Sequence, residues 1–258
     1  MARPLSFARF VQALRAEGLT VRIVGDAEHH NRNHKGPWGP VHGVMIHHTV
    51  TSAGRDDTVG ICRRGYASLP GPLCHGVITK DGTVHVVGYG RTNHAGGGDD
   101  DVLRAVIAES YGARPPADNE SSTDGNRHFY GFECENRGDG ADPWPAVQVE
   151  AMERAAAAVC RAHGWSARSV IGHKEWQPGK IDPHGPAFAD MGEWRESIAD
   201  RLKAKPGGGP APSSYTVRKG DTLSGIAKAH KTTVTKLAKL NRLTDPDRLA
   251  VGQKLKLK

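Results

Sequence analysis

The chain has 258 residues, of which 37% are hydrophobic and 24% charged, and its mean hydropathy is −0.53. This length allows one substantial domain and a small second module, and the absence of a long apolar run excludes an integral membrane protein. The net charge of +7 is unevenly distributed: residues from Tyr215 onward carry +8, which leaves −1 for residues 1–214.

The N-terminal residues predict an amphipathic helix that ends near Gly18. Apolar residues recur there at helical spacing: Phe7, Phe10, Val11 and Leu14. Charged and polar residues interrupt the stretch before the apolar segment of an export signal could form. We therefore expect a protein made in the cytoplasm without a signal peptide.

Strand patterns follow along the chain. Residues 41–50 form a β-branched apolar run typical of a central strand that is covered on both faces. Residues 75–88 predict two strands joined at residues 80–82, where Asp-Gly supplies the turn. Further strands are expected at residues 129–136 and, more briefly, at residues 169–173.

Helical patterns alternate with these strands. One helix is expected from about residue 144 to 163, with Pro145 near its start and Gly164 as its stop. Another is expected over residues 191–203, where three residues form the buried stripe: Trp194, Ile198 and Leu202. The alternation predicts an α/β domain with a mixed central β-sheet flanked by helices.

Residues 205–214 read KPGGGPAPSS, a composition that makes a tether and cannot anchor a core. We therefore predict a first domain over residues 1–204, a linker over 205–214 and a second domain over 215–258.

The four cysteines show no CxxC pair, which argues against a cysteine-only structural zinc site. They are scattered through the first domain: Cys62, Cys74, Cys134 and Cys160. Buried free thiols are the expectation, and one disulfide involving Cys62 or Cys74 is the alternative.

Residues 171–183 place His173, Lys180 and Asp182 within one segment that Pro and Gly interrupt. A catalytic zinc site needs three protein ligands and leaves a fourth position for water. Among the 14 histidines, the adjacent His47 and His48 end an apolar strand, where packing does not explain them. Successive strand residues point to opposite faces, so only one of the two can readily reach a given site.

Five motifs then occur in the order seen in type-2 N-acetylmuramoyl-L-alanine amidases, a family that shares its fold with the peptidoglycan recognition proteins. They are IHHT (46–49), CHGVITKDGTV (74–84), NHAG (93–96), GFECEN (131–136) and GHKEWQPGKIDP (172–183). The resemblance covers roughly residues 35–200. It implies a Zn²⁺ ion bound by His47, His173 and Asp182.

The same resemblance implies the remaining site residues. Glu133 would be the general base, and Lys180 would direct a cation at the substrate carbonyl. Three residues would contact the substrate: Asn93, His94 and Cys74. The choice between His47 and His48, and between Glu133 and Glu135, rests on the alignment of motifs alone. Some relatives carry a Tyr directly before the His of the second motif, where this chain has Cys74.

The C-terminal segment resembles a lysin-motif (LysM) domain over its whole length, with a βααβ order of elements. Such modules bind glycans that contain N-acetylglucosamine, including peptidoglycan, and a charge of +8 favours anionic wall polymers. Nucleic acid is not expected as a partner, because no aromatic residue beyond Tyr215 interleaves with the basic residues.

The resemblance implies a hydrolase that cleaves the lactyl amide between N-acetylmuramic acid and L-alanine. A catalytic set of Glu133, Lys180 and Asp182 favours an enzyme over the alternative of a non-catalytic peptidoglycan receptor. A wall anchor without an export signal favours a phage endolysin, released through a holin to act at the cell wall, over a bacterial autolysin with the same chemistry. We expect a monomer that does not insert into membranes.

Overall fold

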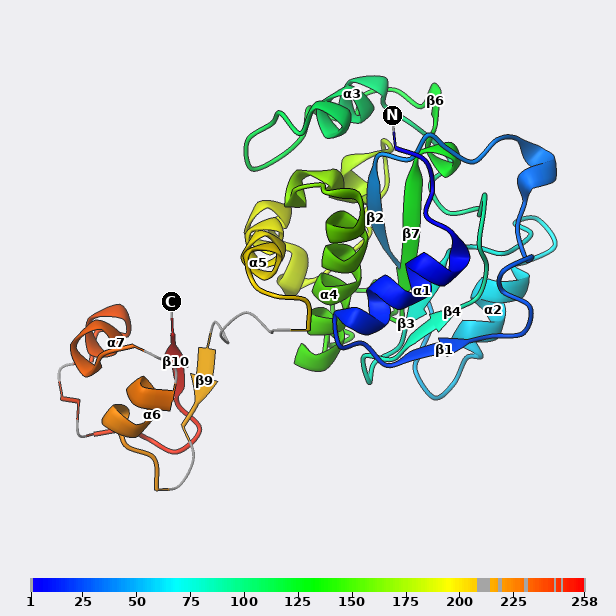
Figure 1. The fold of residues 1–258 in the computed structure, drawn as a ribbon. Coiled ribbons are helices and arrows are strands. Elements are labelled where there is room, and N and C mark those ends of the chain that lie inside the picture. The colour runs from blue at the N-terminus through cyan, green and yellow to red at the C-terminus, as the bar shows by residue number, and fades with distance from the viewer. Residues whose placement is uncertain are drawn as a thin grey trace. The chain divides into compact units, whose positions relative to one another are not determined.

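Figure 1 shows the computed structural model of the chain, which describes residues 2–207, 214–217, 220–229, 232–243, 245–246 and 248–257. The chain divides into two compact units, Met1–Gly208 and Gly209–Lys258. Most of the predicted linker, residues 208–213, lies outside the described residues.

A six-stranded mixed sheet forms the centre of the first unit, in the order β1-β4-β3-β7-β2-β8. Its strands are β1 (Val21–Ile23), β2 (Gly43–His48), β3 (Gly76–Ile78), β4 (Val84–Val86), β7 (Phe129–Cys134) and β8 (Val170–Gly172). Only β3 and β4 pair antiparallel, whereas the other neighbours are parallel. The predicted mixed α/β architecture is confirmed.

The strand β2 has parallel neighbours on both sides and is buried at all its positions, as its apolar sequence predicts. The hairpin of β3 and β4 turns where Asp-Gly was expected, and Gly82 has a φ of +80°. A side chain at this φ is strained, which explains the glycine.

Three helices cover one face of the sheet: α1 (Phe7–Ala16), α4 (Ala146–His163) and α5 (Met191–Lys203) (Figure 1). Their apolar side chains form the main core with Val44 and Ile46 of β2 and with Phe132 of β7. The helix α4 begins after Pro145 and ends at Gly164, which adopts the left-handed conformation. The sequence predicted α1 and α5 from periodicity and α4 from Pro145 and Gly164 at its ends, and the bounds of all three agree within a few residues.

The opposite face carries a smaller core, in which Met45 and Phe129 pack with α3 (Asp100–Ala108) and with Trp176. The sequence analysis did not predict α3 or α2 (Thr58–Arg64). Both begin at an aspartate whose side chain accepts hydrogen bonds from the first helical turn, namely Asp99 and Asp57. An N-capping aspartate is a sequence signal that could have predicted the start of each helix.

The remaining elements of the first unit are short. A two-stranded antiparallel ribbon joins β5 (Gly97–Gly98) and β6 (Thr123–Asp124). Single 3₁₀ turns are η1 (Asn33–Lys35), η2 (Gly125–Arg127), η3 (Ala167–Ser169), η4 (His173–Glu175) and η5 (Pro186–Phe188). All four cysteines are buried free thiols.

The second unit has the predicted βααβ order. It consists of β9 (Ser214–Thr216), α6 (Leu223–Ala229), α7 (Val234–Leu240) and β10 (Lys254–Lys256), with the two strands paired antiparallel. Its core is made by Val217, Leu223, Ile226, Ala227, Leu237 and Leu255. The N-cap of α7 is Thr233, whose hydroxyl accepts from Lys236 N at 3.2 Å. Across the described parts of both units, no helix has the length and apolar character needed to cross a membrane.

Candidate metal centre

The candidate site lies at the carboxyl ends of three neighbouring parallel strands. His47 stands near the end of β2, and Glu133 is its register partner on β7. On the other side of β2, the strand β8 ends at Gly172, and His173 follows directly in η4. Parallel strands end at the same edge of a sheet, where sites in α/β proteins are commonly built. Strand pairing therefore brings together residues that are far apart in sequence.

The alternation of side chains along the strands decides which residues face the site. Met45 belongs to the core on the α3 side, whereas Val44 and Ile46 belong to the core under α1, α4 and α5. With a period of two, His47 shares the face of Met45. His48 instead accepts a hydrogen bond from the backbone of His184, at 3.2 Å from its Nδ1. The structure thus brings His47 to the other predicted ligands.

A tight turn returns the chain from His173 to Asp182. Lys180 N donates to Gln177 O at 3.1 Å, and Gly179 has a φ of +83°. A Pro-Gly pair in the middle of a turn, with the glycine at positive φ, is the pattern of a type II turn. The Pro-Gly dipeptide in the sequence therefore encodes the bend that the site requires.

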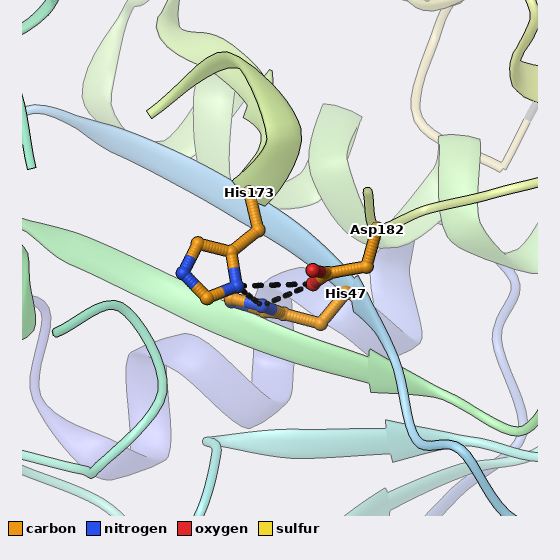
Figure 2. Close-up of side chains that lie close together, drawn as sticks. All are labelled: His47, His173 and Asp182. Carbon is orange, nitrogen blue, oxygen red and sulfur yellow. Dashed lines mark hydrogen bonds and ion pairs between the residues drawn. The ribbon is translucent and has the colours of Figure 1, made fainter. Parts of the chain in front are cut away.

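Three ligand atoms converge at one point (Figure 2). Nδ1 of His47 lies 3.0 Å from Nδ1 of His173, and each of these nitrogens lies 3.0 Å from Oδ2 of Asp182. The exposed fractions of the three residues are 1%, 5% and 8%, in the order His47, His173 and Asp182. Two imidazole nitrogens and a carboxylate oxygen in this arrangement could hold a metal ion.

The electrostatics of the cluster favour the forms that bind metal. Burial, and next the proximity of His173, lower the pKa of His47 to about 4. Burial alone would raise the pKa of Asp182, but the adjacent imidazoles of His173 and His47 outweigh it and hold this pKa far below its usual value. At neutral pH the site therefore offers a neutral imidazole at His47 and an ionised carboxylate at Asp182, which are the protonation states required of metal ligands.

The hydrogen bond at the other ring nitrogen of His173, Nε2, also favours the protonation state that a metal ligand requires. Its Nε2 lies 3.2 Å from the amide oxygen of Gln177, which can only accept a hydrogen bond. The proton of a neutral His173 then belongs on Nε2, which leaves the lone pair of Nδ1 directed at Asp182 and His47. Two imidazole nitrogens and a carboxylate oxygen only 3.0 Å apart can share a cation between them, so the donor set fits a bound metal ion.

The cluster borders a cavity of about 490 Å³ that also contains Glu133 and Lys180. The Oε2 atom of Glu133 is buried, and among the described residues it has no hydrogen-bond partner. Burial raises the pKa of Glu133 well above its ordinary value, Cys62 and Asp182 raise it further, and Lys180 lowers it. A carboxyl group at a pocket wall with one buried, unpaired oxygen has the features of a general base.

Glu135 is excluded from this role by its position. The strand β7 ends at Cys134, and the carboxylate of Glu135 accepts hydrogen bonds from Thr58 Oγ1 at 2.9 Å and Lys80 N at 3.1 Å. It therefore ties α2 to the β3–β4 hairpin and does not line the cavity.

The three residues expected to contact substrate have different positions. Asn93 lines the cavity, with its side chain donating to Pro70 O at 3.1 Å. His94 also borders the cavity, but both of its ring nitrogens have protein partners, including Nε2 of His47 at 3.0 Å. Cys74 does not line the cavity, because its side chain is fully buried in a small core with Cys62.

Several residues around the cavity were not anticipated from the sequence. Gln177 contacts His173, and helix α2 together with the loop after it supplies Cys62, Tyr66 and Leu69 to the cavity wall. The aspartate cap of α2 followed by apolar residues could have indicated the helix. Its position beside the candidate metal ligands depends on tertiary packing and has no local signal.

Two family comparisons agree with this geometry. Residues 37–185 match the family described as N-acetylmuramoyl-L-alanine amidase, and residues 215–258 match the LysM domain. The first match covers more than half of the chain. The chain therefore belongs to the N-acetylmuramoyl-L-alanine amidase family and carries a LysM domain.

Individual relatives are similar over parts of their length. The chain is 34% identical over 141 residues to N-acetylmuramoyl-L-alanine amidase XlyB of Bacillus subtilis (strain 168), covering 52% of this chain and 43% of that protein. It is 35% identical over 132 residues to XlyA of the same organism, covering 51% and 39% respectively. It is 44% identical over 55 residues to the endolysin of Bacillus phage B103, covering 20% and 21%. The chain thus spans about two fifths of the length of the two Bacillus amidases.

Proposed function

We propose that the first unit is a zinc-dependent amidase that cleaves the bond between the lactyl group of N-acetylmuramic acid and L-alanine. The observation that carries this proposal is the convergence of His47, His173 and Asp182 within 3.0 Å, in a cavity shared with Glu133 and Lys180. A receptor that only binds peptidoglycan needs neither a metal site nor a base. Family membership supports the same reaction.

His47, His173 and Asp182 would hold the zinc ion, since two histidines and a carboxylate are an established catalytic ligand set. When bound, zinc acts as a Lewis acid on a carbonyl oxygen and lowers the pKa of a water molecule to about 7. The burial of the three ligands limits competition from bulk water, and the adjoining cavity leaves space for the scissile amide.

The other two residues act on the substrate. Glu133 accepts a proton at Oε2 from the attacking water, whose oxygen bonds to the carbonyl carbon. Lys180 donates hydrogen bonds from Nζ to the carbonyl oxygen as negative charge develops there. Glu133 then returns the proton to the alanine nitrogen while the carbon–nitrogen bond breaks. The products are a free lactyl carboxylic acid and a peptide with an L-alanine amino terminus.

The rim of the cavity suits a glycopeptide. Val50, Tyr66 and Leu69 line it, and all three side chains are more than two fifths exposed. Asn93 adds a polar amide group to the same wall. An open cavity with apolar and amide groups can accept a substrate that remains attached to a large polymer, because the polymer need not enter it.

The LysM domain is the proposed anchor on peptidoglycan. The family match over residues 215–258 supports glycan binding, and the charge of +8 supports attraction to anionic wall polymers. Anchoring keeps the catalytic unit at a high effective concentration near its insoluble substrate.

Digestion of purified cell walls tests the reaction. The full chain should release new L-alanine amino termini without new reducing sugars, and the purified protein should contain about one zinc ion per chain. Glu133→Gln should keep the zinc and reduce turnover by about 10²- to 10⁴-fold. Glu135→Gln is the matched control and should retain activity, because Glu135 lies outside the cavity. New reducing sugars from the wild-type chain, or wall binding without cleavage, would contradict the proposal.

The biological role that we propose is that of a phage endolysin, which the similarity to the endolysin of Bacillus phage B103 supports. Expression in a bacterial host tests it against the alternative of an exported autolysin. An endolysin should lyse its host only when a holin is co-expressed, whereas lysis without a holin would indicate export by another route.

A further inference from the structure

The metal ligand His47 has a second histidine behind it. Nε2 of His47 lies 3.0 Å from Nδ1 of His94, and Nε2 of His94 lies 3.1 Å from the backbone oxygen of Phe129. The two imidazole rings meet at 85° with their centroids 5.1 Å apart. The three groups form a buried chain that leads away from the cluster of ligand atoms.

The direction of the hydrogen bonds in this chain follows from one fixed acceptor. A backbone carbonyl oxygen cannot donate, so Phe129 requires that neutral His94 carry its proton on Nε2. Nδ1 of His94 is then an acceptor, and the partner nitrogen of His47 must be the donor. A neutral His47 with its proton on Nε2 keeps its lone pair on Nδ1, the atom that faces His173 and Asp182.

The surrounding backbone is built to hold His94 in this place. The amide groups of His94 and Ala95 both donate to the side-chain oxygen of Asn126, each at 2.8 Å. The ring lies against Gly131 in the middle of β7, where an added Cβ atom would stand 2.5 Å from Cγ and Nδ1 of the ring. A glycine inside a strand commonly marks such a close approach, and here it provides the space for the imidazole.

We propose that His94 is a positioning residue that sets the tautomer and ring orientation of His47, with Gly131 providing its space. This inference rests on the proposed metal centre and differs from the substrate contact that the sequence resemblance implies. Partners of this kind orient metal ligands, and their loss typically reduces metal affinity by about 10- to 100-fold.

We call the hydrogen-bonded chain from His47 through His94 to the backbone oxygen of Phe129 the relay. Nitrogen NMR of the full-length protein tests it without requiring metal or activity. Long-range proton–nitrogen correlations in metal-free protein at neutral pH should show His47 and His94 both protonated on Nε2. A wild-type His47 protonated on Nδ1 would overturn the proposal.

Two isosteric variants test the consequence for metal binding. Asn places an amide oxygen near the position of Nδ1, and Leu has the shape of Asn without an acceptor. His94→Leu should bind zinc about 10- to 100-fold more weakly than wild type in competition with a chromogenic chelator. His94→Asn should recover much of this loss and restore the Nε2 tautomer of His47. Equal zinc affinity in the Leu variant and the wild type would overturn the positioning role.

The backbone position provides an independent variant. Gly131→Ala should displace the His94 ring and weaken zinc binding in the same direction, while the native fold is verified by circular dichroism. Unchanged zinc affinity in a folded Gly131→Ala protein would contradict the proposed role of this glycine.

The outcome separates this inference from the proposed function. If the wild-type chain binds zinc and cleaves the wall while His94→Leu has the same zinc affinity, the relay is wrong and the amidase assignment stands. If His47 carries its proton on Nε2 but the wild-type chain releases no L-alanine amino termini, the amidase assignment is wrong and the relay stands.

Discussion

His47 and Glu133 are register partners on the adjacent parallel strands β2 and β7, and their side chains share one face of the sheet. A proposed metal ligand and a proposed base are thus held at a spacing that the backbone hydrogen bonds of the sheet determine. Sites built on strands are held more closely to one geometry than sites built on loops. By contrast, Asp182 and Lys180 reach the cavity from a turn, and substitutions there should separate metal binding from turnover.

Removal of Asp182 should abolish metal binding and activity together. Asp182→Ala deletes the only anionic member of the proposed ligand set and leaves His47 and His173 close together without a carboxylate. Zinc content, measured on the purified protein, and release of L-alanine amino termini should both fall to background. Wild-type cleavage by a folded Asp182→Ala protein would show that the ligand assignment is wrong.

Removal of the Lys180 charge should spare the metal and impair turnover. Lys180→Met should reduce kcat by about 10²- to 10³-fold, the usual cost of losing one group that stabilises an oxyanion. Lys180 also lowers the pKa of Glu133, against the larger effect of burial. Its loss raises that pKa, and because the base acts as a carboxylate, the acid limb of kcat/KM should move to higher pH. A reduced kcat with an unmoved acid limb would contradict this electrostatic link.

Acid should destabilise the first unit through buried histidines such as His75. Burial lowers the pKa of His75 to about 4 from its ordinary value of 6.5. Above pH 6.5 the ring is neutral in both states; between pH 6.5 and 4 only the unfolded state takes up the proton. The free energy of unfolding should therefore fall as pH falls through this window, by about 3 kcal/mol for His75.

Urea denaturation between pH 7.5 and 4, with a chelator present, measures this dependence. His75→Gln should lower stability at every pH and also flatten the pH slope, because the titrating group is gone. Part of the slope should remain, since the pKa values of His42, His47 and His163 are also lowered to about 4. An unchanged slope in the variant would show that His75 is not a source of the pH dependence.

Deletion of the second unit should separate binding from catalysis. A chain that ends at residue 207 keeps the whole described first unit and should cleave a soluble muramyl peptide at the wild-type rate. Its co-sedimentation with cell walls should decrease strongly, and that of the full chain should weaken as salt rises, because screening reduces the attraction of the +8 segment. Full wall binding by the truncated chain would contradict the anchoring role of LysM.

Local sequence patterns predicted most of the architecture. The apolar run of β2, the Asp-Gly turn after β3, the Pro and Gly at the ends of α4 and the periodicity of α5 each depend on a few neighbouring residues. The structure has these elements where they were expected. The sequence analysis did not predict α2 and α3, because it did not use the N-capping aspartates Asp57 and Asp99 as helix signals. The candidate ligands were named from the order of motifs, which depends on resemblance and not on local physics.

The sequence by itself determined the class of fold, the second βααβ unit and the residue types available for a metal site. Tertiary structure alone decided which of these residues meet. His47 faces the site because strand pairing puts Met45 and His47 on the α3 side, and Glu135 lies outside because β7 ends one residue before it. Cys74 is enclosed and His94 lies against His47 because of contacts with distant segments. Local patterns set the conformation of each segment, whereas the burial and partner of a side chain depend on residues that only folding brings near.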